Sequence, residues 1–117
     1  MRYMFLLFND PDKAPAPGSA EADEQFAAYG AFTEEVRASG AFQNGDPLQP
    51  ASAATVVRVN GGANPLTTDG PFVETREQLG GYYVLECKDL DEAIELAAKI
   101  PAARDGAVEV RPIRELS

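Results

Sequence analysis

The 117-residue sequence contains no histidine and a single cysteine, Cys87. Histidine is the commonest general base near neutral pH and the commonest ligand for zinc, copper and iron, so its absence excludes sites built on it. A lone cysteine can form neither an intrachain disulfide nor a cysteine-rich metal site. The sequence also lacks the alternating acids of an EF-hand. We therefore expect no metal and no cofactor, and any catalysis must use carboxylates, tyrosines, arginine or the thiol.

Basic residues are also few, because ten Lys and Arg stand against nineteen Asp and Glu and give a net charge of -9. This charge would repel a nucleic-acid backbone and an anionic membrane, so we expect neither as a direct partner. The apolar run at residues 3–8 is too short for a signal peptide and is followed at once by Asn9 and Asp10. Together with the single cysteine, these features predict a cytoplasmic protein.

The length and the 44% hydrophobic content suit one domain over residues 1–117. Apolar residues at spacings of three and four predict a helix over 20–39, with an apolar face made by Phe26, Tyr29, Phe32 and Val36. A capping pattern at Asp89 and Glu92 predicts a second helix that Pro101 ends, with an apolar stripe made by Leu90, Ala93, Ile94, Ala97 and Ala98. The remaining patterns predict strands at 1–8, 41–48 (an edge or bulged strand), 55–60, 66–68, 81–87 and 107–113, with turns at 60–62 and 103–106.

This order, βαβ followed by a hairpin and then βαβ, predicts an α+β protein with the ferredoxin-like split βαβ plan and an extra hairpin. Right-handed crossovers place both helices on one face of the sheet. The strands at 1–8 and 81–87 are nevertheless apolar on both faces. A second copy of the same sheet is the simplest cover for the open face, so we expect a homodimer through sheet faces. The alternative is that the polar, proline-rich loop after residue 8 folds back over that face.

The stretch "TTDGPFVETREQLGGYYVLE" contains most of the candidate site residues. The Gly-Pro step makes a rigid corner that sets the directions of Asp69 and Phe72, either for ligand contact or as a plain turn. Asp69 is the candidate acid or base. Arg76 either pairs with its acidic neighbours or clamps an anionic ligand. Gly80 and Gly81 predict a bulge or a relief of crowding at the start of the strand.

Three tyrosines are further candidates for lining a pocket: Tyr3, Tyr82 and Tyr83 lie on the two interior strands, although packing in a core or interface is the simpler account of them. Cys87 has no histidine with which to form a reactive pair, so we expect a buried, inert thiol.

Residues 68–101, "TDGPFVETREQLGGYYVLECKDLDEAIELAAKIP", resemble the YCII-related family, in particular its DGPF branch, named for the residues at 69–72. The resemblance extends to "MRYMFLLF", "AAYGAFTEEVRASG", "LQPASAATVVRV" and "GAVEVRPI". It implies small bacterial cytosolic proteins with a ferredoxin-like fold that pairs into a dimeric α/β barrel. Some YCII-like proteins are proposed enzymes in which a histidine and an aspartate meet; without histidine, only the acid has a counterpart here, with Asp69 the leading candidate.

Three functions follow as hypotheses. The first is a homodimer that binds a small, mostly apolar or aromatic molecule between sheet and helices near the DGPF loop. The second is an enzyme that uses Asp69 as general acid or base, with Arg76 or a tyrosine holding the substrate. The third is a transcription-associated protein-interaction module without a pocket. The sequence names neither the ligand nor the partner.

Overall fold

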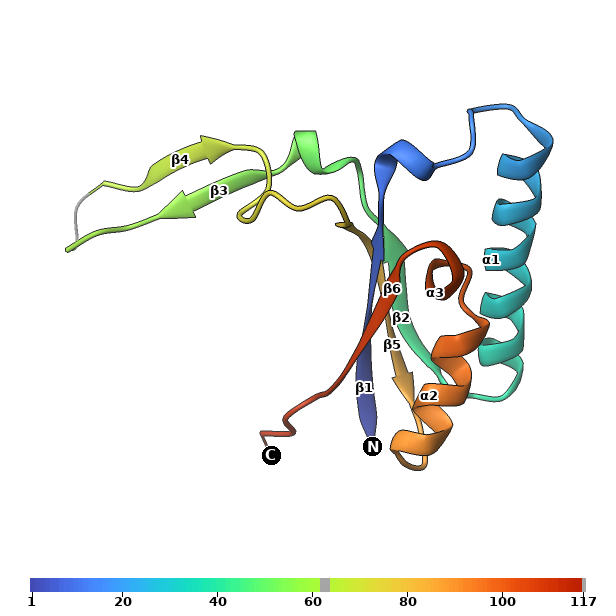
Figure 1. Ribbon diagram of the computed structural model, residues 1–117. Helices are drawn as coiled ribbons and strands as arrows, with labels where there is room; N and C mark the ends of the chain where they lie inside the picture. The colour runs from blue at the N-terminus through green and yellow to red at the C-terminus, as the bar shows by residue number, and fades with distance from the viewer. Residues whose placement is uncertain (62–63, 117) are drawn as a thin grey trace.

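The computed structural model describes residues 1–61 and 64–116 as a four-stranded antiparallel sheet with helices on one face and a two-stranded arm (Figure 1). The sheet order is β2-β5-β1-β6, as in the predicted ferredoxin-like plan with its extra hairpin. The sheet comprises β1 (Arg2–Asn9), β2 (Phe42–Pro47), β5 (Gln78–Glu86) and β6 (Ala107–Pro112); the arm comprises β3 (Thr55–Arg58) and β4 (Leu66–Asp69). The helices are α1 (Ala20–Ala38), α2 (Leu90–Lys99) and α3 (Ala102–Asp105), with short 3-10 turns at Pro11–Lys13 and Ala51–Ala53.

The core lies between the sheet and the helices. Along β1, the side chains of Tyr3, Phe5 and Leu7 alternate onto this face, and none is more than 5% exposed. They pack with Leu85 and with residues of the helices, among them Phe32, Val36, Ala93 and Ile100. Complete burial of such side chains stabilises the fold by about 1.5–3 kcal/mol each.

Local signals set the helix ends. Ser19 caps α1 by accepting a hydrogen bond from the Ala22 amide at 3.1 Å. Asp89 caps α2 through the Glu92 amide at 2.9 Å, and the Glu92 carboxylate accepts from the Lys88 amide at 2.9 Å. This confirms the predicted capping interaction, with the returning bond made one residue earlier than in the usual box.

Two predictions about the helices were wrong in detail. In the expected apolar stripe of α2, Ala93 and Ala97 are buried, but Leu90 and Ile94 are 50% and 52% exposed and Ala98 is also exposed. The segment expected as a turn at 103–106 is largely the short helix α3, which redirects the chain into β6.

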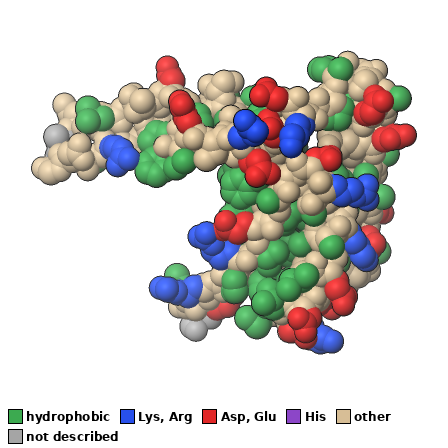
Figure 2. Space-filling model, in the orientation of Figure 1, with side chains coloured by type: hydrophobic (Ala, Val, Ile, Leu, Met, Phe, Trp, Pro, Cys, Tyr) green, Lys and Arg blue, Asp and Glu red, His purple; other side chains and the backbone are tan. Residues whose placement is uncertain are grey.

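The opposite face of the sheet has no helix over it (Figure 1). Met4, Leu6, Phe8 and Tyr82 lie on this open face and are half-buried, whereas Val84 is buried by its neighbours. The loop after β1 runs to α1 on the helix side and leaves this face uncovered. Figure 2 shows hydrophobic side chains gathered in the hollow between the arm and the C-terminal segment. The prediction that both faces of the central strands are apolar is therefore confirmed.

A bulge shifts the pairing of β1 with β5, since Leu7 pairs with Gly81 but Phe8 pairs with Leu79. Gly80 is the extra residue, as predicted for the Gly-Gly step. β2 is the predicted edge strand and has a register shift between Phe42 and Asn44. The β1–β5 bulge lies at the end of the sheet that leads to the arm, whereas the β2 shift lies at the opposite end, close to the end of α1.

The arm pairs β3 with β4 from Thr55–Asp69 to Arg58–Leu66 and projects away from the main sheet (Figure 1). Every residue of β4 is exposed, and only Val56 of β3 is half-buried. The predicted turn at 60–62 falls partly outside the described residues; Gly61 has the left-handed φ of +61°. No helix among residues 1–61 and 64–116 is long and apolar enough to cross a membrane.

Candidate ligand-binding site

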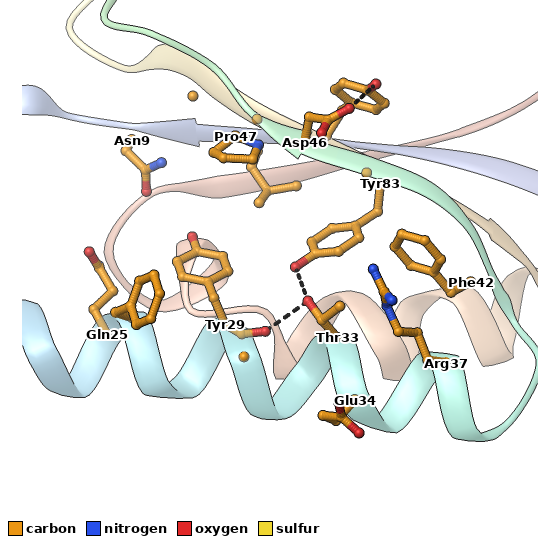
Figure 3. A pocket seen from close by; sticks show the side chains of 17 residues that line it. Asn9, Gln25, Tyr29, Thr33, Glu34, Arg37, Phe42, Asp46, Pro47 and Tyr83 are labelled. Carbon is orange, nitrogen blue, oxygen red and sulfur yellow. Dashed lines mark hydrogen bonds between the residues drawn. The ribbon is translucent and has the colours of Figure 1, made fainter.

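A cavity of about 560 Å³ lies between α1 and the edge of the sheet formed by β2 and β5; we call it the helix cleft (Figure 3). Aromatic side chains line both of its walls: α1 contributes Phe26 and Tyr29, and the strands contribute Phe42 and Tyr83. Phe26 is 82% exposed although it belongs to the apolar face predicted for this helix. An exposed aromatic side chain at a cavity mouth is available for contact with a ligand or a partner.

Tyr83 points from the sheet into the helix cleft and meets Thr33 of α1 (Figure 3). The Tyr83 and Thr33 hydroxyl oxygens are 2.9 Å apart, and Thr33 donates its proton to the Tyr29 carbonyl at 2.9 Å. Because Thr33 has only one hydroxyl proton, Tyr83 must be the donor to Thr33. The Tyr83 oxygen keeps a free lone pair, so it can accept a hydrogen bond from a ligand.

Packing fixes the ring of Tyr83. It makes edge-to-face contacts with Phe32 and Phe42, at centroid distances of 5.2 and 6.4 Å. A Cβ at Gly45 would lie 2.7 Å from Cδ1 of this ring, so the cleft requires glycine there.

Arg37 stands beside the helix cleft with its guanidinium 4.6 Å from the centroid of the Phe42 ring. Within the described residues it forms no salt bridge. Glu34 also borders the cleft, but its side chain points to the far side of α1 (Figure 3). Arg37 is therefore a stacked cation with free donors, which suits a planar anion.

Polar groups also line the other end of the helix cleft. Asn9 points from β1, and Gln25 and Tyr29 point from α1 (Figure 3). Burial raises the pKa of Tyr29 above its ordinary value of 10.0; nearby Tyr83 adds to the rise, and a backbone hydrogen bond from Ala102 opposes it. Tyr29 is therefore a neutral phenol at pH 7, and amide and phenol groups that can donate or accept face this end.

The DGPF loop borders a different cavity, of about 1050 Å³, which we call the loop cleft. It brings together the predicted residues Asp69 and Arg76, and it adjoins the helix cleft because Asn9 and Gly80 line both. The corner forms as predicted, with Gly70 at φ +93° and its amide bonded to the Ala54 carbonyl at 2.7 Å.

Among residues 1–61 and 64–116, nothing holds the side chain of Asp69 or Arg76 in a fixed interaction. Both side chains are exposed, and Arg76 forms no salt bridge in the part of the chain that the structure describes, so the expected pairing with its acidic neighbours is wrong. In the loop cleft, sequence reasoning missed Asp10, which is 6% exposed, lines this cleft and accepts a hydrogen bond from the Asp12 amide at 2.9 Å. Its position directly after a buried strand was the available signal.

The other predicted residues lie apart. Tyr3 is 2% exposed in the core, with its hydroxyl 3.8 Å from the Met1 sulfur. Tyr82 borders the helix cleft, but its phenol lies on the open face and donates to Asp46 at 2.9 Å. Phe72 lines a third cavity of about 630 Å³ at the root of the arm, and Arg58 stacks on its ring at 4.9 Å. The predicted set therefore does not form one site.

Cys87 is 2% exposed, as predicted for an inert thiol. Burial raises its pKa above 9.0, and nearby Glu92 adds to the rise. In the described residues, no group of three or more Cys, Asp or Glu side chains is placed to hold a metal ion.

Comparisons with known proteins agree with this architecture. Uncharacterized protein R00369 of Rhizobium meliloti (strain 1021) is 33% identical over 115 residues, which cover 97% of this chain and 92% of that protein. The 5-chloro-2-hydroxyhydroquinone dehydrochlorinase of Burkholderia phenoliruptrix AC1100, solved with 2,5-dihydroxybenzoquinone, matches with a TM-score of 0.55 at 18% identity, over 97% of this chain and 94% of that one. This second likeness shows the fold alone. The model of the YCII-related domain matches residues 1–117, and the chain therefore belongs to the YCII-related family.

Proposed function

We propose that this protein is a cytosolic homodimer that binds a small aromatic molecule with an acidic group in the helix cleft. The observation that carries the proposal is an aromatic cavity beside an arginine that forms no salt bridge among the described residues. A volume of about 560 Å³ falls in the range of small-molecule sites, about 300–1000 Å³. The rings of Phe26, Tyr29 and Phe42 would pack against the ligand ring while Arg37 pairs with its anionic group.

The dehydrochlorinase supports the choice of an aromatic ligand, since it shares the fold and was solved with a dihydroxybenzoquinone. This support is an analogy of fold. The dimer part of the proposal rests on the uncovered apolar face of the sheet, and the cytosolic part on the single, buried cysteine.

Titration calorimetry with 2,5-dihydroxybenzoquinone, an acidic planar ring, tests the proposal. We expect saturable binding that Arg37→Gln weakens about tenfold or more, because a hydrogen bond to a charged group contributes about 1.5–3 kcal/mol. Arg58→Gln is the matched control, since Arg58 also stacks on a phenylalanine, at 4.9 Å, but lies outside the helix cleft. Absence of binding at millimolar ligand, or equal losses in both variants, would contradict the proposal.

The geometry favours binding over the two alternatives. Asp69, the acid of the enzyme hypothesis, does not line the helix cleft and has an exposed side chain, so nothing around it supplies the desolvation that favours proton transfer. We therefore expect Asp69→Asn to leave ligand affinity unchanged, and turnover lost in this variant would instead support the enzyme. An interaction module needs no cavity, whereas this chain has a cleft of ligand size.

A further inference from the structure

With its projecting arm, the chain exposes more surface to solvent than a compact monomer of the same size. The radius of gyration is 16.3 Å, against about 13 Å for a compact chain of this length. The accessible surface is 8217 Å², against about 6200 Å² for a monomer of 12.5 kDa. The difference, about 2000 Å², exceeds the roughly 800 Å² that each partner buries in a standard interface.

The arm is also expected to have little stability without further packing. An isolated two-stranded hairpin is marginally stable in water and needs further packing. Val57 and Val59 are 58% and 57% exposed, and Leu66, which belongs to the other face of the hairpin, is 58% exposed. The arm therefore carries exposed apolar side chains on both faces.

The direction and length of the arm identify what it meets. The arm projects from the side of the sheet opposite the helices, where the open apolar face lies (Figure 1). Residues 55–61 span about 20 Å when extended, whereas two sheets packed face to face lie about 10 Å apart. If a second copy docks its sheet on the open face, an arm of this length extends beyond that sheet and reaches the layer behind it.

The charge of the arm also favours a second copy of the chain as its partner. Residues 47–69, which include the whole arm, contain two charged side chains of opposite sign, Arg58 and Asp69, in a chain with a net charge of -9. The arm is thus the stretch of this acidic protein that can approach another acidic copy without repulsion.

We infer that the β3–β4 arm is a clasp between subunits, which lies against the second copy beyond the sheet-to-sheet interface. This inference rests on the proposed homodimer and adds a second contact region to it. By two-fold symmetry each copy gives one arm and receives one, so the two contacts are equivalent.

Sedimentation analysis of single variants tests the clasp. Val57→Lys and Leu66→Lys each place a charge on one face of the arm. Because both residues are 58% exposed, each variant should keep the fold, which circular dichroism checks. Ile94→Lys is the matched control, since Ile94 is 52% exposed but lies on α2, on the other side of the sheet. We expect at least one arm variant to raise the dimer dissociation constant about tenfold or more, whereas the control, which adds the same charge, should not raise it.

Hydrogen exchange gives an independent readout. Amides of β3 and β4 should exchange more slowly above the dimer dissociation constant than far below it. A dimer unaffected by either arm variant, with arm exchange independent of concentration, would overturn the clasp and leave the dimer standing. A wild-type protein that is monomeric at about 10 μM would overturn both the clasp and the proposed homodimer.

Discussion

Gly45 and Tyr83 are neighbours in the wall of the helix cleft. A methyl group at Gly45 would lie 2.7 Å from Cδ1 of the Tyr83 ring and 3.1 Å from the Tyr82 carbonyl oxygen, which is held in the sheet. Gly45→Ala must therefore displace the ring that Phe32 and Phe42 hold. We expect the free energy of unfolding to fall by about 1–3 kcal/mol in urea denaturation.

Gly30 provides the control for this prediction, because it lies within α1 and a Cβ there would meet nothing within 4 Å. Gly30→Ala should raise the free energy of unfolding by up to about 1 kcal/mol through helix propensity alone. The two Gly→Ala substitutions should thus change the free energy of unfolding in opposite directions. A stabilising Gly45→Ala would mean that the cleft wall is looser than the contacts indicate.

Cys87 and Tyr29 make the fold sensitive to alkali. Burial raises the pKa of both groups in the folded chain, from ordinary values of 9.0 and 10.0. The unfolded chain therefore loses these protons first as the pH rises. Their contribution to stability is complete below the unfolded pKa values and is lost as the pH passes through the folded ones.

We expect the free energy of unfolding, measured in urea, to decline as the pH rises above about 9. Cys87→Ala should make this decline shallower, and Tyr29→Phe should do so at higher pH. The variants need to be compared by slope, since each also changes stability at pH 7 by altered packing. An unchanged slope in both variants would show that other groups cause the alkaline loss.

The capping of α2 can be tested at the scale of the element. Asp89 accepts the Glu92 amide at 2.9 Å, whereas Asp91 in the same first turn is described with no such bond. Asp89→Ala should lower the free energy of unfolding by about 0.5–2 kcal/mol. Asp91→Ala removes only a favourable charge at the helix start and should cost less, about 0.3–1 kcal/mol. Equal losses in urea denaturation would assign the effect to charge instead of the cap.

The elements that sequence predicts well are those set by neighbouring residues. The cap at Asp89, the buried alternation of Tyr3, Phe5 and Leu7, and the bulge at Gly80 each depend on local pattern and backbone geometry. The exposure of Ile94 and Leu90 was not predictable in this way, because it depends on how α2 sits over the sheet. Periodicity gives a face of a helix but not the angle at which the helix is packed.

The candidate site was only partly predictable because it depends on the whole molecule. The motif at 69–72 drew attention to Asp69 and Phe72, yet the arm and the β5 bulge place these residues outside the helix cleft. The sequence predicts Tyr83 as a site residue because it lies on a central strand. It does not predict Arg37 and Phe42, which line the cleft because α1 and β2 lie next to each other in the fold. Long-range juxtaposition of this kind leaves little trace in one sequence.

The net charge of the whole molecule should influence how tightly two copies associate. Two copies with a charge of -9 each repel at long range, while the open face and the arm would hold them by apolar contact. Salt screens the repulsion, with a Debye length that falls from about 10 Å at 0.1 M to about 3 Å at 1 M. We therefore expect the dimer dissociation constant from sedimentation to fall as sodium chloride is raised.

A variant with less charge separates screening from a general effect of salt on apolar contact. Replacing Asp91 and Glu95, two exposed acids of α2, with lysine changes the net charge from -9 to -5 without touching the open face or the arm. This variant should form a tighter dimer at low salt and respond less to sodium chloride, because less repulsion is left to screen. A dissociation constant that rises with salt in the wild type would mean that ion pairs, and not the apolar face, hold the subunits together.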